Sequence, residues 1–164
     1  MKRTLLLILT LVVSAMSIED IAEKMAIDLE MTRAEVQTCF DKTNVTLEDL
    51  MQVGKIMNDD LQTVDFDDSA LRAGCFFKCL CHKKGAMTGA RVNVDRIKGI
   101  IRSVLKKEAR PTLEANLVAK LFQVLDTCVN RVNSITNECE VSLKYILCCG
   151  KEMKLINRSN NDDE

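Results

Sequence analysis

Tryptophan is absent from this sequence of 164 residues, and proline, tyrosine and histidine each occur once, at Pro111, Tyr145 and His82. Aromatic residues make up only 4% of the chain, which excludes a large aromatic core. The single proline and the absence of Asn-Gly and Asp-Gly pairs argue against a protein built of β-hairpins. A single histidine also leaves little for a zinc site or for a histidine-driven pH switch.

Charge of neither sign dominates, since 23 Lys and Arg stand against 24 Asp and Glu. No basic cluster with interleaved aromatic residues is present, so nucleic acid is not an expected partner. The charged and polar residues also carry no recognisable catalytic motif. His82 follows Cys81 beside two lysines, where it is expected to be solvated, and no Gly-x-Ser-x-Gly sequence occurs. We therefore expect that the protein is not an enzyme.

The one long apolar run lies at the N-terminus. Lys2 and Arg3 precede residues 5–13, which are apolar apart from Thr10, and the small residues Ala15 and Ser17 follow. This order is typical of a secretory leader. The run is also shorter than the roughly 20 residues that a helix needs to cross a bilayer.

Residues 1–17 are therefore predicted to be a signal peptide. Cleavage would leave 164 − 17 = 147 residues, the size of one domain. We expect residues 18–164 to form that domain, with a disordered tail at 157–164. The predicted localisation is secreted and extracellular, without stable membrane insertion.

Hydrophobic periodicity predicts helices along nearly the whole mature chain. The expected helix starts are marked by capping residues or by proline at Thr32, Thr46, Asp67, Asn93 and Pro111. Gly85 is expected to end the helix that begins near Asp67. The last strong helix, over residues 138–150, is apolar on all sides, which predicts a position in the middle of the molecule.

Eight cysteines accompany these helices, at Cys39, Cys75, Cys79, Cys81, Cys128, Cys139, Cys148 and Cys149. Because Cys75 and Cys79 are four residues apart on one predicted helix, their thiols share a face and suit bridges to two different neighbours. No paired Cys-x-x-Cys motif occurs, so we expect neither a metal nor a cofactor. Spacing alone does not decide the pairing, because eight cysteines permit 105 arrangements.

The order and intervals of six of these cysteines resemble those of the insect odorant-binding and pheromone-binding proteins, the PBP/GOBP family. The two strict intervals of that family are met: three residues separate Cys75 from Cys79, and eight separate Cys139 from Cys148. The stretches 74–80 (GCFFKCL) and 84–90 (KGAMTGA) are similar to the ant pheromone-binding members in particular.

This resemblance implies an all-α fold, a compact bundle of about six helices stapled by disulfides around an apolar cavity. The bridges that it implies are Cys39–Cys79, Cys75–Cys139 and Cys128–Cys148. It implies a secreted carrier, active in olfaction and chemosensory behaviour, that transports small hydrophobic odorants or pheromones in chemosensory lymph or glandular fluid. The partner is then a small lipophilic ligand, and a homodimer or a chemoreceptor contact remains open.

Cys81 and Cys149 are surplus to the family pattern. Three fates are open to them: a fourth bridge Cys81–Cys149, an intermolecular bridge, or two inert buried thiols. The fourth bridge is the preferred expectation.

The interior is expected to be rich in methionine, whose flexible thioether adapts to ligands of irregular shape. Tyr145 is a candidate to offer its hydroxyl to a ligand carbonyl or alcohol. The residues expected to line the cavity are apolar positions on the predicted helices. They are Leu50, Val53, Met57, Phe77, Leu80, Met87, Ile97, Ile101, Leu105, Leu121, Phe122, Leu125, Tyr145 and Ile146.

A second functional class is a venom, glandular or lipid-interacting helical protein without an olfactory role. The sequence offers no exposed basic amphipathic face for such a role.

Two glycosylation triplets begin at Asn44 and Asn157. With His82 as the only histidine, ligand affinity is expected to depend weakly on pH between neutral and about pH 6.

Overall fold

The computed structural model describes residues 17–58, 66–107 and 115–161. Within these ranges the chain forms seven helices and one short hairpin. The helices are α2 (Ile18–Leu29), α3 (Arg33–Thr43), α4 (Leu47–Asn58), α5 (Asp68–Lys83), α6 (Val94–Lys107), α7 (Ala115–Val132) and α8 (Glu138–Asn161), and the strands are β1 (Met87–Thr88) and β2 (Arg91–Val92). The predicted all-α class is confirmed. The predicted leader and the predicted helix start at Pro111 fall outside the described residues, apart from Ser17.

The capping residues expected from the sequence begin their helices as predicted. Thr32 forms a capping box with Glu35 at the start of α3. The hydroxyl of Thr46 accepts from the backbone N–H of Asp49 at 3.2 Å, and the Asp67 side chain caps α5. These local hydrogen bonds fix where each helix starts because they satisfy backbone N–H groups that the helix itself leaves unpaired.

The hairpin after α5 was not expected. Met87 pairs with Val92 and Thr88 with Arg91 in an antiparallel register. Gly89 supplies the positive φ of 56° in the turn, a conformation that glycine adopts without steric cost. The absence of Asn-Gly and Asp-Gly pairs was a poor guide here, because a hairpin this short needs only one residue with positive φ.

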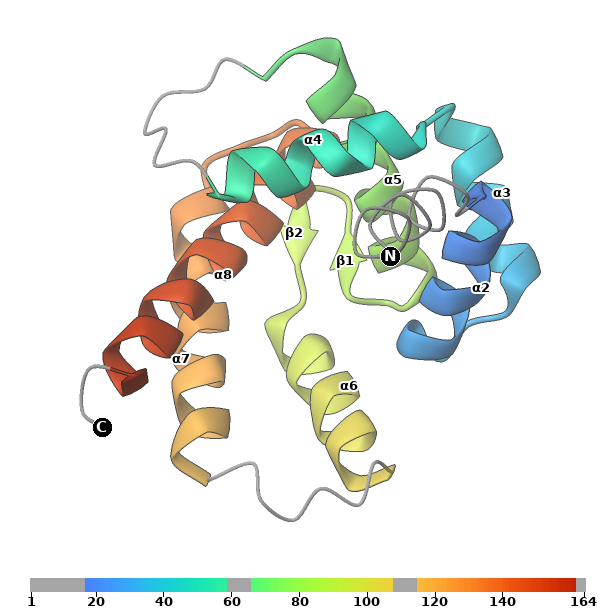
Figure 1. Cartoon of the computed structure of the whole chain (residues 1–164). Helices are drawn as coiled ribbons and strands as arrows, with labels where there is room; N and C mark the ends of the chain where they lie inside the picture. The colour runs from blue at the N-terminus through green and yellow to red at the C-terminus, as the bar shows by residue number, and fades with distance from the viewer. Residues whose placement is uncertain (1–16, 59–65, 108–114, 162–164) are drawn as a thin grey trace, which may run out of the picture.

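The arrangement places α2 and α3 on one side of the molecule and α7 and α8 on the other (Figure 1). The most extensive contact between helices joins α5 to α8, and α4 packs against both. The hairpin packs on α5 and α8, and α6 contacts α7. In Figure 1, α6 continues from the hairpin at the end of the molecule away from α4.

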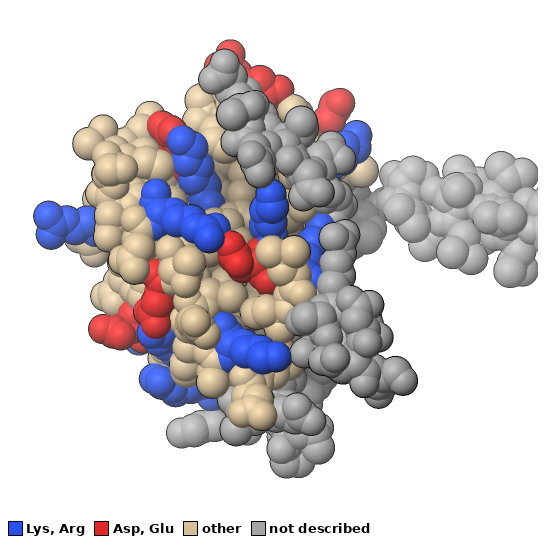
Figure 2. Space-filling view, turned by 90° about the vertical axis from the view of Figure 1, so that its left-hand side faces the viewer, with Lys and Arg blue, Asp and Glu red and all other residues tan. Residues whose placement is uncertain are grey.

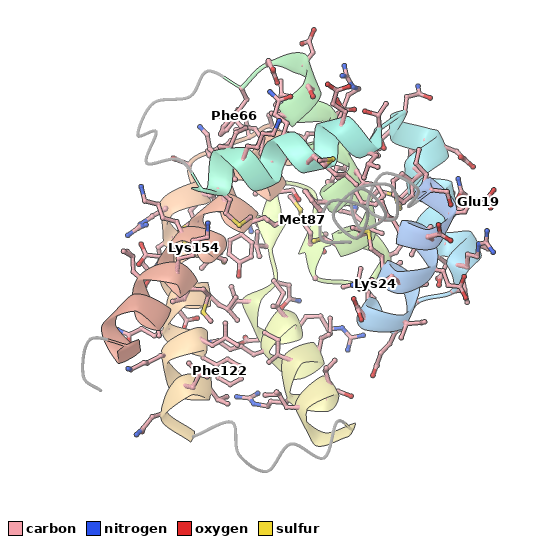
Figure 3. The ribbon with its side chains drawn as sticks, in the orientation of Figure 1. Glu19, Lys24, Phe66, Met87, Phe122 and Lys154 are labelled. Carbon is pink, nitrogen blue, oxygen red and sulfur yellow. A yellow bond between two sulfur atoms is a disulfide. The ribbon has the colours of Figure 1, made fainter. Side chains whose placement is uncertain are left out.

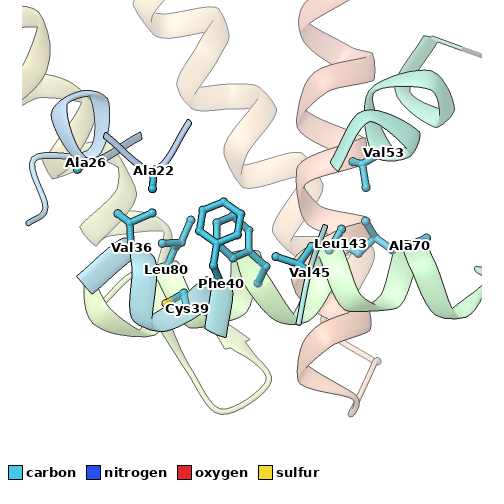
Figure 4. Close-up of a cluster of buried hydrophobic side chains, with 12 residues drawn as sticks. Ala22, Ala26, Val36, Cys39, Phe40, Val45, Val53, Ala70, Leu80 and Leu143 are labelled. Atoms are coloured by element: carbon cyan, nitrogen blue, oxygen red, sulfur yellow. The ribbon is translucent and has the colours of Figure 1, made fainter. Parts of the chain in front are cut away.

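Buried apolar side chains form two separate clusters. The first cluster draws its buried residues from the N-terminal helices together with one residue of α8. They are Ala22, Ala26, Val36, Cys39, Phe40, Val45, Val53, Ala70, Ala73, Phe76, Leu80 and Leu143 (Figure 4). The Phe40 and Phe76 rings meet there with their centroids 4.4 Å apart.

The second cluster lies between the C-terminal elements. Its buried residues are Met87, Val124, Leu125, Cys128, Val132, Val141 and Tyr145. Because α8 gives Leu143 to the first cluster and Val141 and Tyr145 to the second, it stands between them. The prediction that this helix occupies the middle of the molecule is confirmed.

The predicted end of the last helix at Gly150 is wrong, since α8 continues to Asn161. Gly150 lies inside the helix, where a Cβ atom would collide with the side chain of Met57 from α4. The glycine thus permits close contact between two helices and does not end one. The disordered tail predicted at 157–164 overlaps this last stretch of α8.

Candidate functional site

Three disulfides hold the helices around the two clusters. Cys39–Cys79 joins α3 to α5, Cys75–Cys139 joins α5 to α8, and Cys128–Cys148 joins α7 to α8. These are the three pairs that the family resemblance implied. The α5 helix carries two of the bridges from one face, as the spacing of Cys75 and Cys79 indicated.

The expected fourth bridge is not formed, because Cys81 and Cys149 are free cysteines in the structure. Cys149 directly follows the bridged Cys148, and Cys81 lies two residues after the bridged Cys79. On a helix these side chains diverge by about 100° and about 200°, so each free thiol lies on another face than the bridged one. Both thiols pack against the second cluster, and burial raises the pKa of each to about 11. A thiol with so high a pKa is almost entirely protonated near neutral pH and reacts slowly with disulfide reagents.

Tyr145 brings the one phenol of the chain into the same cluster. Its side chain is 7% exposed, and its hydroxyl faces the Cys149 thiol, with no stronger hydrogen-bond partner among the described residues. Burial raises the pKa of Tyr145 far above its usual range, and the neighbouring Cys149 and Cys81 thiols add to the shift. A buried hydroxyl with only a thiol as neighbour is unusual, because sulfur is a weak hydrogen-bond partner and an unsatisfied polar group costs free energy.

The fourteen candidate lining residues do not all come together. Leu50, Val53, Phe77 and Leu80 belong to the first cluster. Met87, Ile97, Ile101, Phe122, Leu125 and Tyr145 belong to the second cluster. Met57, Leu105, Leu121 and Ile146 are partly exposed and belong to neither. The structure therefore separates candidates that the sequence grouped into one lining, and their role as lining stays a prediction.

Helix α6 covers one side of the second cluster, and it does so with side chains that are only partly buried. No side chain of α6 within 94–105 is fully buried, although Ile97 and Ile101 face the cluster. Phe122 of α7 points towards α6 (Figure 3), where the Arg102 guanidinium lies 4.7 Å from the ring centroid. Lys98 of α6 forms an ion pair with Asp126 of α7 at 2.7 Å. Charged side chains of α6 and α7 thus lie beside the apolar residues of the second cluster.

The cavity that the structure displays most clearly lies elsewhere, on the outer face of α5. It has a volume of about 830 Å³. Its lining comes from α3, α5 and the start of α8, and consists of Thr38, Lys42, Thr43, Asp68, Leu71, Arg72, Cys75, Lys78, Cys79, His82, Lys83 and Cys139. None of the fourteen candidate lining residues takes part, and the charged side chains among its lining were not expected from the sequence.

Sequence reasoning also missed a buried carboxylate. Asp49 of α4 is 3% exposed and accepts hydrogen bonds from Arg72 Nη2 at 2.8 Å and from Ser69 Oγ. These donors, Arg72 first, hold the pKa of Asp49 well below its usual range. The only local signal was the spacing from Thr46 to Asp49, which matches a capping box and does not reveal the partners on α5.

The glycosylation candidates differ in what can be said of them. Asn44 is exposed at the end of α3 with a positive φ of 51°, while the side chain of Asn157 is outside the described set.

Within the described ranges, no group of three or more His, Cys, Asp or Glu side chains is arranged to hold a metal ion. No helix in those ranges is both long and apolar enough to span a membrane.

Comparison with known proteins gives consistent matches. The family model described as the PBP/GOBP family matches residues 21–152. The chain is 26% identical over 141 residues to pheromone-binding protein Gp-9 of Solenopsis globularia littoralis, covering 86% of this chain and 83% of the relative. It is 24% identical over 112 residues to pheromone-binding protein Gp-9 of Solenopsis nigella gensterblumi, with 68% of each chain covered.

Proposed function

The chain belongs to the PBP/GOBP family, and from that premise we propose that it is a secreted carrier of small lipophilic ligands such as odorants or pheromones. It acts by binding and transport, and not by catalysis. The relatives named as pheromone-binding proteins support this assignment. The predicted leader and the three disulfides support an extracellular setting, because such bridges persist in oxidising compartments.

We place the proposed ligand site in the second cluster, next to Tyr145. The observation that carries this choice is the buried Tyr145 hydroxyl, whose hydrogen-bond neighbour among the described residues is the weakly bonding Cys149 thiol. A ligand with one oxygen acceptor would satisfy it, while its hydrocarbon part would contact the apolar side chains of α6 and α7. We propose that the ligand enters beside α6, because none of the described side chains of this helix is fully buried.

Displacement of a fluorescent hydrophobic probe, N-phenyl-1-naphthylamine, tests this proposal. Three competitors of equal chain length are compared: an alcohol, a methyl ketone and the plain hydrocarbon. Saturable probe binding and displacement are expected. Tyr145→Phe should weaken binding of the alcohol and ketone about tenfold, the equivalent of one hydrogen bond, and should leave the hydrocarbon unaffected.

Ser142→Ala is the matched control, because Ser142 is a buried hydroxyl without a partner on α8 but belongs to neither cluster. Its removal should leave all three affinities unchanged. Absence of saturable probe binding, together with leakage from lipid vesicles, would favour the lipid-interacting alternative. Probe binding that responds equally to both substitutions would leave the carrier role standing and move the site away from Tyr145.

A further inference from the structure

The cavity on α5, here called the basic groove, has no part in the proposed ligand site. It follows one complete face of the helix. The lining residues of α5 from Asp68 to Lys83 recur at intervals of three and four, which is the spacing of one helical face. Fifteen residue steps correspond to a length of about 22 Å. A groove of this length exceeds what a small odorant would fill and suits a segment of polypeptide.

The floor of the basic groove is rigid and partly apolar. Cys75 and Cys139 line it and are joined to each other, and Cys79 is joined to Cys39 of α3. Two bridges therefore fix α3 and α8 to the same face of α5. Leu71 adds an apolar contact. Because the walls are already held in place, binding at this groove would cost little ordering of the protein.

The lining holds four Lys or Arg residues and His82 together with the carboxylate of Asp68, and the carboxylate of Glu138 lies 3.9 Å from His82. Arg72 is engaged by Asp49, and Lys78 is engaged by Glu138. Lys42 has no ion pair among the described residues. Lys83 interacts electrostatically with Glu35 at the start of α3. Lys42 and Lys83 therefore stand out as the cations most available to an incoming anion.

A second face of the molecule carries charges of both signs. On the side of the molecule formed by α7 and α8, basic and acidic side chains are interspersed (Figure 2). There Arg131 pairs with Glu152 at 2.7 Å, and Lys144 pairs with Glu140 at 2.6 Å. Since the complete sequence has a net charge of −1, an excess of cations in one groove is not a consequence of composition.

We propose that the basic groove docks an acidic segment of a partner protein, separately from the ligand site. Within the lining of α5, Asp68 lies at the start of the groove and Lys78, His82 and Lys83 lie towards its other end. Because Glu138 already lies against Lys78 and His82, the bound segment places its carboxylates against Lys42 of α3 and Lys83 of α5. Charge complementarity of this kind steers association and fixes the register of the partner. The interaction goes beyond ligand transport and does not depend on which ligand is carried.

Fluorescence anisotropy of a short fluorescein-labelled peptide of alternating Glu and Asp measures this docking. The peptide should bind saturably, and binding should weaken as added salt screens the charges. The double variant Lys42→Glu, Lys83→Glu should raise the Kd for the peptide about tenfold. The matched peptide of Gln and Asn should not bind.

The control variant Lys24→Glu, Lys55→Glu makes the same change of charge at two exposed lysines outside the groove. It should keep the Kd of the unmodified protein. Circular dichroism and displacement of the hydrophobic probe should be unchanged in both double variants. Equal loss of peptide binding in the two variants, or no peptide binding at low salt, would overturn the proposal. A dimer detected by sedimentation and abolished only by the groove variant would assign the groove to a second copy of the chain instead.

Discussion

Gly74 of α5 lies directly against the backbone carbonyl of Cys139 on α8. A Cβ atom on Gly74 would overlap that oxygen and would lie 3.0 Å from Leu143 Cβ. The missing side chain lets the two helices approach until the Cα atoms of Cys75 and Cys139 are 4.3 Å apart, within bonding reach of a disulfide. Gly150 of α8 makes a comparable contact with α4, but there the obstacle is the side chain of Met57.

Gly74→Ala should therefore destabilise the protein by about 2 kcal/mol. The reason is that the carbonyl belongs to the backbone of Cys139, which the bridge to Cys75 holds in place. Gly150→Ala should be close to neutral. The flexible Met57 side chain can shift, and alanine gains about 1 kcal/mol over glycine inside a helix. Urea unfolding of both variants measures the difference. Equal losses in the two variants would show that the backbone contact is not the deciding feature.

Asp49 makes stability depend on acid. Its folded pKa lies below its ordinary value of 3.8, so the unfolded chain binds more protons at low pH. The stabilisation is complete above about pH 4 and is lost as pH falls through the folded pKa. Asp49→Asn should cost about 2 kcal/mol at pH 7, since it weakens hydrogen bonds made to a charge.

Thermal unfolding between pH 7 and pH 2 measures this effect. The variant should lose less stability over that interval than the unmodified protein. Asp28→Asn is a suitable control, because Asp28 is exposed on α2. A variant whose stability falls in parallel with that of the unmodified protein would exclude Asp49 as the group responsible.

Tyr145→Phe should raise the free energy of unfolding of the ligand-free protein by about 1 kcal/mol. The reason is that this buried hydroxyl loses its hydrogen bonds to water on folding and regains only a weak one from the Cys149 thiol. The urea midpoint should rise with an unchanged m-value. A lower midpoint would mean that the hydroxyl has a stronger internal partner in solution, and it would also weaken the case for a ligand bond.

Cys81 and Cys149 should give two thiols per chain when the unreduced protein is denatured and treated with a disulfide reagent. In the folded protein at pH 8 the reaction should be slow. With a pKa of about 11 for each thiol, about one molecule in a thousand carries the reactive thiolate at that pH. Cys81→Ser and Cys149→Ser should each lower the count by one. A count of zero before reduction would restore the fourth bridge or an intermolecular one.

Local patterns in the sequence were sufficient for most of the helices. Thr32, Thr46, Asp67 and Asn93 begin helices because their side chains bond to backbone groups a few residues away, an interaction that needs no distant partner. The family pattern of cysteines supplied the three bridges, whose long sequence separations no local rule could give. The helix end predicted at Gly150 was wrong because glycine occurs both at helix ends and where a neighbouring helix comes close. The local sequence does not distinguish these two cases.

The helical class and the starts of several helices could be predicted from the sequence, since they follow from periodicity and contacts within one turn. Three features became visible only in the folded protein: the division of the apolar side chains into two clusters, the burial of Asp49 against Arg72, and the open basic groove on one face of α5. Each of these depends on which helices lie side by side. That choice is made by packing between residues far apart in the chain, and it leaves no mark on the spacing of neighbouring residues.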